Sequence, residues 1–511
     1  MKVIGKQGMV ASAHPLISQS GINILKAGGL AIDAAIAMAN TAGVVLPDMC
    51  GIGGDAFLLY YNRKENKVYA INGSGEIPKA YDTNHKIKKY GMTSVSVPGC
   101  VSTCFKALEL WGTKDFKELS KDAIKLAKEG VLAPKLVVRH MHTDLKYLKN
   151  SSTAKLLYLN SKEEPLTTKD LIINKEYAKS LEYLNNYGVD GFYKGEIARK
   201  IINHSKQNGG YFEMSDLENY QAECVEPLIL NYRGYEIYQT PPVSQGYLHL
   251  MEMGILSHFD LINLDEAKRI HYLIESKKLA FNHREIGAIA PKTVLKQQYT
   301  HDLSNLINDK KANLSLNDPY VQNNGHTTSF VVTDKEGNGV SFILSIAGTW
   351  GSMEVVKDTG ILLNNRAGVG LNTIINHPNS IHNRRKAIHT LNTWLIKKDD
   401  KLKYLGNTPG GDYQVMWNMQ LISNLIDKKK DVWQAVSAPK FRADYQKNQH
   451  TVDLEVSFGT DTIDKLKTLG HQVKIIPENS ASGASELIEI KEDGSLEGAS
   501  DPRSMGIVKA Y

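Results

Sequence analysis

The sequence predicts a mixed α/β fold in which one chain supplies several helices and several paired strands. Two helical patterns occupy residues 16–42, strand patterns follow residue 55, and a hairpin pattern spans residues 327–345. The 511 residues suffice for one large layered core or for two domains. A hydrophobic content of 42% and a charged content of 23% are ordinary for a globular protein. Helices are expected to dominate the first two-thirds of the chain, and strands to open the final third.

The N-terminal segment is predicted to form two helices followed by two strands. The first helix, around residues 18–26, ends at the Gly-Gly pair 28–29, which favours a helix C-cap. The second, residues 33–40, is rich in alanine and begins at Asp33, whose negative charge suits a helix N-terminus. An apolar run and an alternating run within residues 56–73 then indicate paired strands.

The middle of the chain is predicted to be mostly helical. The helical pattern covers residues 116–205, changes to strand and loop at 227–246, and resumes as a long stretch to about Arg284. Residues 297–325 are polar and weakly patterned, which predicts a surface linker. A further strand-rich run covers residues 360–365.

The character of the sequence changes abruptly where this linker ends, at His326. Thr327 and Thr328 open a strand that pairs, through a turn, with residues 339–345. A hydroxyl at such a junction can attack the preceding carbonyl, and hydrolysis of the resulting ester leaves Thr327 as a new N-terminus. Its α-amino group, with an ordinary pKa of about 8, can then act as general base, while the β-methyl restricts the rotamers of the hydroxyl. Taken alone, the same residues also fit a strand that merely begins with two threonines.

Two further features favour catalysis at this junction. Residues 408–412, Thr-Pro-Gly-Gly-Asp, form a turn in which Gly410 and Gly411 allow backbone N–H groups to face an oxyanion. Ser345, at the end of the paired strand, is placed to orient the amine of the nucleophile. A tight turn and an ordinary strand serine are the simpler interpretations.

The chain resembles the γ-glutamyltranspeptidase family of N-terminal-nucleophile hydrolases from Gly8 to Tyr511. The order and number of the matching motifs carry this resemblance, since any one of them is weak. The matching segments are residues 8–37, 51–57, 97–101, 232–246, 326–345, 359–365, 408–412 and 498–503.

The resemblance implies a four-layer αββα sandwich in which a large segment, residues 1–326, and a small segment, residues 327–511, form one intertwined domain. It implies that Thr327 is the nucleophile and that Ser345 takes the place of the second hydroxyl of the family's threonine dyad. The two glycines of the 408–412 turn match the oxyanion-hole glycines. We therefore expect a precursor that cuts itself and then cleaves an amide through an acyl-enzyme, by hydrolysis or by acyl transfer.

The family's contacts to a γ-glutamyl group are not kept. Each lost contact to a substrate charge is worth ~2 kcal/mol when desolvated, so selection for γ-glutamyl groups should be weak. This pattern is more similar to the oxamate-amidohydrolase and acylase members of the family. The departures are Ser74 for an arginine, Val369 for the amine-binding aspartate, Ile388 and His389 for a serine pair, and Ala347 for an asparagine.

Arg366 is the candidate contact for a new substrate carboxylate, because its planar fork can bind an acid through two N–H groups. Pairing of Arg366 with a structural acid is the alternative. His389 and Asp412 are further candidate substrate-binding residues. Two other functions stay open: a γ-glutamyl hydrolase or transferase whose glutamate contacts have moved, and an unprocessed protein that keeps the fold without catalysis.

Composition argues against several other classes of protein. The net charge is only +6, and the lysine clusters lack interleaved aromatic residues, so we expect no nucleic-acid partner. The absence of a ~18-residue apolar run and of a signal-peptide pattern, with four cysteines and no CxxC pair, favours a cytoplasmic protein without a membrane partner. His140 and His142 have no third ligand at metal-type spacing, so no metal or cofactor is expected. The expected partners are a small amide substrate, the two fragments of one precursor, and further copies of the molecule.

Overall fold

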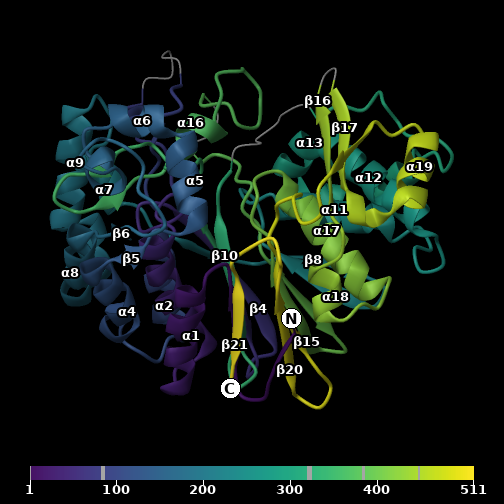
Figure 1. The fold of residues 1–511 in the computed structure, drawn as a ribbon, viewed down its shortest axis with the longest axis horizontal. Coiled ribbons are helices and arrows are strands. Elements are labelled where there is room, and N and C mark those ends of the chain that lie inside the picture. The colour runs from purple at the N-terminus through teal and green to yellow at the C-terminus, as the bar shows by residue number, and fades with distance from the viewer. Residues whose placement is uncertain (1, 82–86, 319–324, 383–385, 447–448) are drawn as a thin grey trace.

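Two seven-stranded sheets pack face to face between two outer layers of helices (Figure 1). The computed structural model describes residues 2–81, 87–318, 325–382, 386–446 and 449–511. Both sheets contain strands from both sides of Thr327, so neither segment of the chain completes a sheet alone. The predicted four-layer αββα sandwich is confirmed.

The first sheet carries the predicted hairpin at its centre. β10 and β11 pair antiparallel, β11 also pairs with β3, and β10 with β2. In spatial order its strands are β21 (Ile507–Ala510), β2 (Met9–Ser12), β10 (Thr328–Thr333), β11 (Gly339–Ser345), β3 (Asp55–Asn62), β4 (Lys67–Gly73) and β7 (Glu223–Val225).

The second sheet faces the first across an apolar interlayer. Leu59 of β3, Val331 of β10 and Leu405 of β15 meet there and are fully buried. In spatial order its strands are β1 (Val3–Gly5), β20 (Leu496–Ser500), β19 (Glu486–Ile490), β15 (Lys401–Asn407), β14 (Trp394–Lys398), β9 (Tyr235–Gln239) and β8 (Leu228–Tyr232).

Helices cover the outer face of each sheet (Figure 1). On the first sheet, the alanine-rich α2 is buried along its whole length, as expected for a helix between a sheet and further helices. The helices on that side are α1 (Pro15–Lys26), α2 (Ala31–Val45), α3 (Cys100–Trp111), α4 (Phe116–Glu129), α5 (Lys135–Thr143), α6 (Leu145–Asn150), α7 (Ala154–Tyr158), α8 (Lys175–Tyr193) and α9 (Glu196–Gln207). Those on the side of the second sheet are α11 (Gly246–Leu256), α12 (Glu266–Asn282), α13 (Arg284–Ile289), α15 (Gln297–Ser304), α17 (Tyr413–Ile426), α18 (Val432–Val436) and α19 (Thr460–Thr468).

Most elements expected from the sequence are confirmed, and two expectations are wrong in part. The predicted linker begins with a helix, α15, whose Leu303 packs into the core of the second sheet. The run 360–365 contributes only the two-residue strand β13 (Ile361–Leu362), followed by the short helix α16 (Arg366–Gly370). Part of the predicted linker, residues 319–324, lies outside the described residues. No helix in the described part of the chain is long and apolar enough to cross a membrane.

Candidate active site

Four polar residues lie side by side across one end of the first sheet. Ser345, the last residue of β11, pairs with Asp55, the first residue of β3. The register of the neighbouring pairs places Ser74 beside Asp55 and Thr327 beside Ser345. The predicted nucleophile, its predicted hydroxyl partner and two large-segment residues therefore form one row.

This row faces the second sheet. Val331 and Leu59 stand an even number of residues from Thr327 and Asp55, and both lie in the core between the sheets. Because side chains alternate between the two faces of a strand, the row shares the interlayer face. The candidate site therefore lies at one end of the apolar interlayer.

The bond before Thr327 is held from the opposite strand. Thr327 is 5% exposed, and its hydroxyl has no hydrogen-bond partner within the described residues. The Ser345 hydroxyl donates to the carbonyl oxygen of His326 at 2.6 Å and accepts from the N–H of Ala347 at 2.8 Å. In the uncleaved chain Ser345 thus binds the carbonyl that Thr327 would attack, rather than an α-amino group, which does not exist before cleavage.

The turn at residues 408–412 has the backbone geometry of a donor site. Gly410 and Gly411 have φ angles of 140° and 59°, and a Cβ on Gly410 would lie 2.3 Å from a ring carbon of Trp417. Their carbonyls accept from the N–H groups of Tyr413 and Gln414 in the first turn of α17, each at 3.2 Å. With its amide oriented to satisfy its neighbours, the Gln414 side chain of α17 accepts from the N–H of Gly411 at 3.3 Å, so an oxyanion at this turn would compete with Gln414 for that N–H.

The linker covers this turn in the uncleaved chain. A Cβ on Gly325 would lie 2.9 Å from Cα and 3.3 Å from N of Gly411, so the two backbones are in direct contact. Gly325 precedes His326 by one residue. Release of this end after cleavage would therefore uncover the backbone of the turn.

Arg284 ties the turn to the linker. Its buried guanidinium donates to Asp412 at 2.7 Å and to Asp318 of the linker at 3.1 Å. Asp412 stands directly before α17. The Asp412 carboxylate is therefore already bound by Arg284 in the uncleaved chain. A contact of Asp412 with substrate stays a prediction.

Arg366 is paired with a structural acid, as the alternative interpretation expected. Its Nε donates to Asp55 Oδ2 at 3.0 Å, and both side chains are buried. Burial raises the pKa of the Asp55 carboxyl, and the positive charge of Arg366 opposes this rise. Nη2 of Arg366 is buried without a partner in the described structure. This nitrogen could donate to a ligand.

Two of the positions that depart from the γ-glutamyl pattern contact each other. The Ser74 hydroxyl lies 2.6 Å from Nε2 of His389, whose ring stacks edge-on against Phe57. Burial, followed by the charges of Arg366 and Lys386, holds the pKa of His389 well below its ordinary value, so the ring is neutral. Its Nδ1 has no partner among the described residues. Ser74 and His389, which both differ from the family's γ-glutamyl contacts, therefore form a hydrogen-bonded pair beside Asp55.

The other departures have different surroundings. Val369 lies in α16, and Ile388 packs into the core on the outer side of the second sheet. Ala347 has a positive φ of 77° and closes the loop after β11, where its carbonyl accepts from the N–H of His326 at 2.9 Å.

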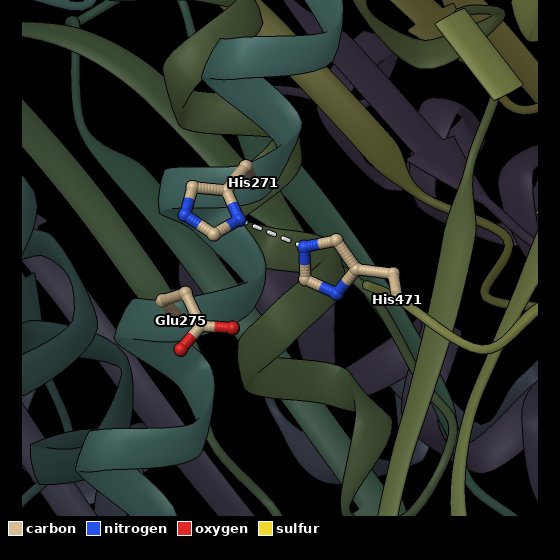
Figure 2. A group of neighbouring side chains, drawn as sticks. All are labelled: His271, Glu275 and His471. Atoms are coloured by element: carbon tan, nitrogen blue, oxygen red, sulfur yellow. Dashed lines mark hydrogen bonds between the residues drawn. The ribbon is translucent and has the colours of Figure 1, made fainter. Parts of the chain in front are cut away.

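A group with metal-ligand chemistry lies elsewhere, between α12 and the segment before β18 (Val473–Ile476) (Figure 2). His271, Glu275 and His471 place ligand atoms within 4.8 Å of one another, and all three are buried. His271 Nδ1 lies 2.8 Å from His471 Nε2, and Lys278 donates to Glu275 at 2.6 Å. A lysine charge at this distance opposes a bound cation.

The same group anchors the linker. Nε2 of His271 donates to the carbonyl of Asn308 at 2.8 Å, and Glu275 accepts from the N–H of Asn313 at 3.2 Å. Lys278 donates to the Asn313 carbonyl at 2.9 Å. These contacts fit an anchor for the chain leading to His326, and the absence of a metal cofactor stays a prediction.

The comparisons with known proteins agree with this architecture. The four-layer fold is that of the N-terminal-nucleophile hydrolases. The sequence profile described as Gamma-glutamyltranspeptidase matches residues 17–511. The chain belongs to the gamma-glutamyltranspeptidase family, and it is an enzyme.

Three relatives illustrate the range of activities in this family. The "Glutathione hydrolase-like YwrD proenzyme" of Bacillus subtilis (strain 168) is 31% identical, covering 99% of this chain and 98% of the relative. The "Oxamate amidohydrolase proenzyme" of Klebsiella pneumoniae is 28% identical, covering 99% of each. The crystal structure of cephalosporin acylase from Bacillus halodurans superposes with a TM-score of 0.92 at 28% identity, covering 100% of this chain and 97% of the other.

Sequence reasoning missed several residues that the structure brings to this region. Asp55 was visible only as part of a motif, although its register opposite Ser345 follows once β3 and β11 are paired. Arg284 and Asp318 come together only in the folded chain, since 34 residues separate them. The sequence suggests no role for His140 beyond a weak metal-ligand pattern, whereas its ring contacts His326.

Proposed function

We propose that this chain is the precursor of an amide hydrolase that cuts itself between His326 and Thr327 and then uses Thr327 as its nucleophile. The observation that carries the proposal is the junction itself. The Ser345 hydroxyl holds the His326 carbonyl beside the buried, unpartnered hydroxyl of Thr327 within the described structure. A serine that donates to this oxygen would stabilise the negative charge that develops there during attack.

Self-cleavage would proceed in two balanced steps. First, Oγ of Thr327 attacks the carbonyl carbon of His326, the C–N bond breaks, and the hydroxyl proton passes to the nitrogen, which becomes the α-amine. Water then hydrolyses the ester, releasing His326 as a carboxylate and restoring the Thr327 hydroxyl. The new amine can act as general base toward its own hydroxyl because its ordinary pKa lies near 8.

Turnover would reuse the nucleophile with a different donor site. Thr327 attacks the substrate amide, the leaving amine takes a proton, and an acyl-enzyme forms. The N–H groups of the Gly410–Gly411 turn would bind the oxyanion once Gly325 has moved away. Water, or an acceptor amine, then releases the acyl group.

The substrate that the site fits best is an amide whose acyl group carries a carboxylate close to the reacting carbon. The unpartnered Nη2 of Arg366 and Nδ1 of His389 are buried in the described structure near Asp55, which belongs to the same row as Thr327. A ligand acceptor would satisfy groups that are otherwise costly to bury. The relatives named oxamate amidohydrolase and cephalosporin acylase support a substrate other than glutathione.

We expect kcat/KM for oxamate to exceed the value for its uncharged analogue oxamide and the value for γ-glutamyl anilides. The reason is that Ser74, Val369 and His389 offer no ion pair to the α-amine and α-carboxylate of a γ-glutamyl group, which would be desolvated without partners. The measurement is kcat/KM for these three compounds and for longer acyl amides, with the processed enzyme. Equal kcat/KM values for oxamate and oxamide would show that the enzyme does not recognise the substrate carboxylate.

A second candidate is a γ-glutamyl hydrolase whose glutamate contacts have moved to other residues. It is favoured by the relatives that carry glutathione hydrolase names at 31% and 30% identity. The same comparison separates the two, because a γ-glutamyl kcat/KM in the efficient range of about 10⁴ M⁻¹s⁻¹ or higher would establish this second candidate.

Arg366→Lys is expected to raise KM about 10-fold or more and to change kcat less. Lysine can keep a contact with Asp55, but as a point charge it cannot also supply the donor that Nη2 directs to a ligand. The readout is KM and kcat for the best substrate, with a thermal melt to verify folding. An unchanged KM would show that Arg366 supports the site through Asp55 but does not contact substrate.

A further inference from the structure

The residue before the proposed cleavage point is held on three sides. The backbone N–H of His326 donates to Ala347, and its carbonyl accepts from Ser345. Its imidazole packs edge-on against the ring of His140, with centroids 4.7 Å apart and ring planes at 73°. The first two contacts come from the end of β11 and the loop that follows it, whereas the third comes from α5, nearly 190 residues earlier in the chain.

His140 is itself fixed by a buried carboxylate. Its Nδ1 donates to Asp48 Oδ2 at 2.5 Å, and Asp48 is fully buried while His140 is 6% exposed. A carboxylate that accepts from one nitrogen of an imidazole sets the tautomer and the orientation of the ring. The other oxygen of Asp48 is buried without a partner in the described residues. Burying this carboxylate with one oxygen unpaired costs free energy, which an apolar residue at the same position would not cost.

The Asp48 segment also holds the loop that presents Ser345. The Asp48 carbonyl accepts from the N–H of Trp350, and the Met49 carbonyl accepts from the N–H of Ile346, each at 2.9 Å. One short segment between α2 and β3 thus fixes both the loop beyond Ser345 and, through His140, the side chain of His326. These contacts surround the His326 carbonyl, which Thr327 would attack.

We propose that Asp48 and His140 form a positioning pair for self-cleavage, which holds the His326 side chain so that its carbonyl stays on the Ser345 hydroxyl and beside Thr327. This proposal rests on the proposed function, because it concerns the same bond. Neither residue forms or breaks a bond in it, and both act through His326. A displacement of the reacting carbonyl by about 1 Å is enough to slow such a step 100-fold.

The ring of His326 that contacts His140 is uncharged. Burial, and next the neighbouring His140, lower the pKa of His326 to about 4, so its imidazole is uncharged near neutral pH. An aromatic ring at position 326 should therefore preserve the contact, whereas a carboxylate there would meet the buried carboxylate of Asp48.

The test follows disappearance of the full-length chain after cell-free synthesis, resolved by denaturing electrophoresis. We expect His140→Ala and Asp48→Asn to slow self-cleavage about 10-fold or more. His142→Ala is the matched control, since this residue is exposed on the same helix, and it should cleave like the wild type. His326→Phe should cleave near the wild-type rate, and His326→Asp should be slowest.

A double-mutant cycle shows whether the pair acts through His326. His326→Ala should slow cleavage, and adding His140→Ala to it should slow cleavage no further, because the contact is already gone. Additive effects in chains with unchanged thermal unfolding midpoints, or wild-type cleavage by both His140→Ala and Asp48→Asn, would overturn the proposal. A wild-type chain that never cleaves before Thr327 would instead count against the proposed function.

Discussion

Thr327→Ala is expected to abolish both self-cleavage and turnover, because one hydroxyl serves both reactions. The variant should remain a single chain of 56.7 kDa and form no acyl-enzyme. Folding should be largely unaffected, since the Thr327 hydroxyl has no hydrogen-bond partner to lose among the described residues. The checks are denaturing electrophoresis, activity against the best amide substrate and a thermal melt.

The matched control is the neighbouring threonine. Thr328 is also buried, with an unpartnered hydroxyl in the described structure, but it points to the opposite face of the sheet. Thr328→Ala should therefore cleave and turn over like the wild type. Thr327→Ser keeps the hydroxyl without the β-methyl, so we expect slower cleavage rather than none. Wild-type turnover by Thr327→Ala would refute the assignment of the nucleophile.

Gly411→Val is expected to lower kcat about 100-fold, or about 3 kcal/mol of transition-state stabilisation. The φ angle of 59° at Gly411 is unfavourable for a β-branched residue, so valine would shift the backbone N–H that binds the oxyanion. Self-cleavage should suffer less than turnover, because Ser345 binds the His326 carbonyl in that step. The measurement compares the cleavage rate with kcat in the same preparation.

Gly494→Val is the control for backbone strain alone. Gly494 has a φ of 82° and open space around its Cβ position, in an exposed turn between β19 and β20. It should lose stability without a specific loss of kcat. Equal kcat values for Gly411→Val and the wild type, with the protein folded, would remove this turn from the site.

Most elements of the fold were predictable because they have strong local patterns, whereas the four-layer arrangement followed only from the family resemblance. The alanine-rich run became α2, and the Thr327 hairpin became β10 and β11. Sequence pattern failed where tertiary packing decides. Residues 297–304 lack a clear periodicity, yet Leu303 anchors them as α15, and the apolar run 360–365 is buried as loop with little strand.

The site was predictable only where its residues sit in recognisable motifs. Thr327, Ser345 and the two glycines stand in such motifs, whereas the contacts between them depend on strand register. The pairing of Asp55 with Arg366 and of Ser74 with His389 joins residues more than 300 positions apart. No local pattern in the sequence reports such a contact. The contact of His140 with His326 could not be predicted for the same reason.

Cleavage before Thr327 is best tested by the intact mass of the purified protein combined with N-terminal sequencing of its smaller fragment. We predict two fragments, with Thr327 as the first residue of the smaller one, and a mass increase on that fragment alone when a slow amide substrate is trapped. A homogeneous chain of 56.7 kDa that nonetheless turns over substrate, or acyl transfer to any other residue, would contradict it.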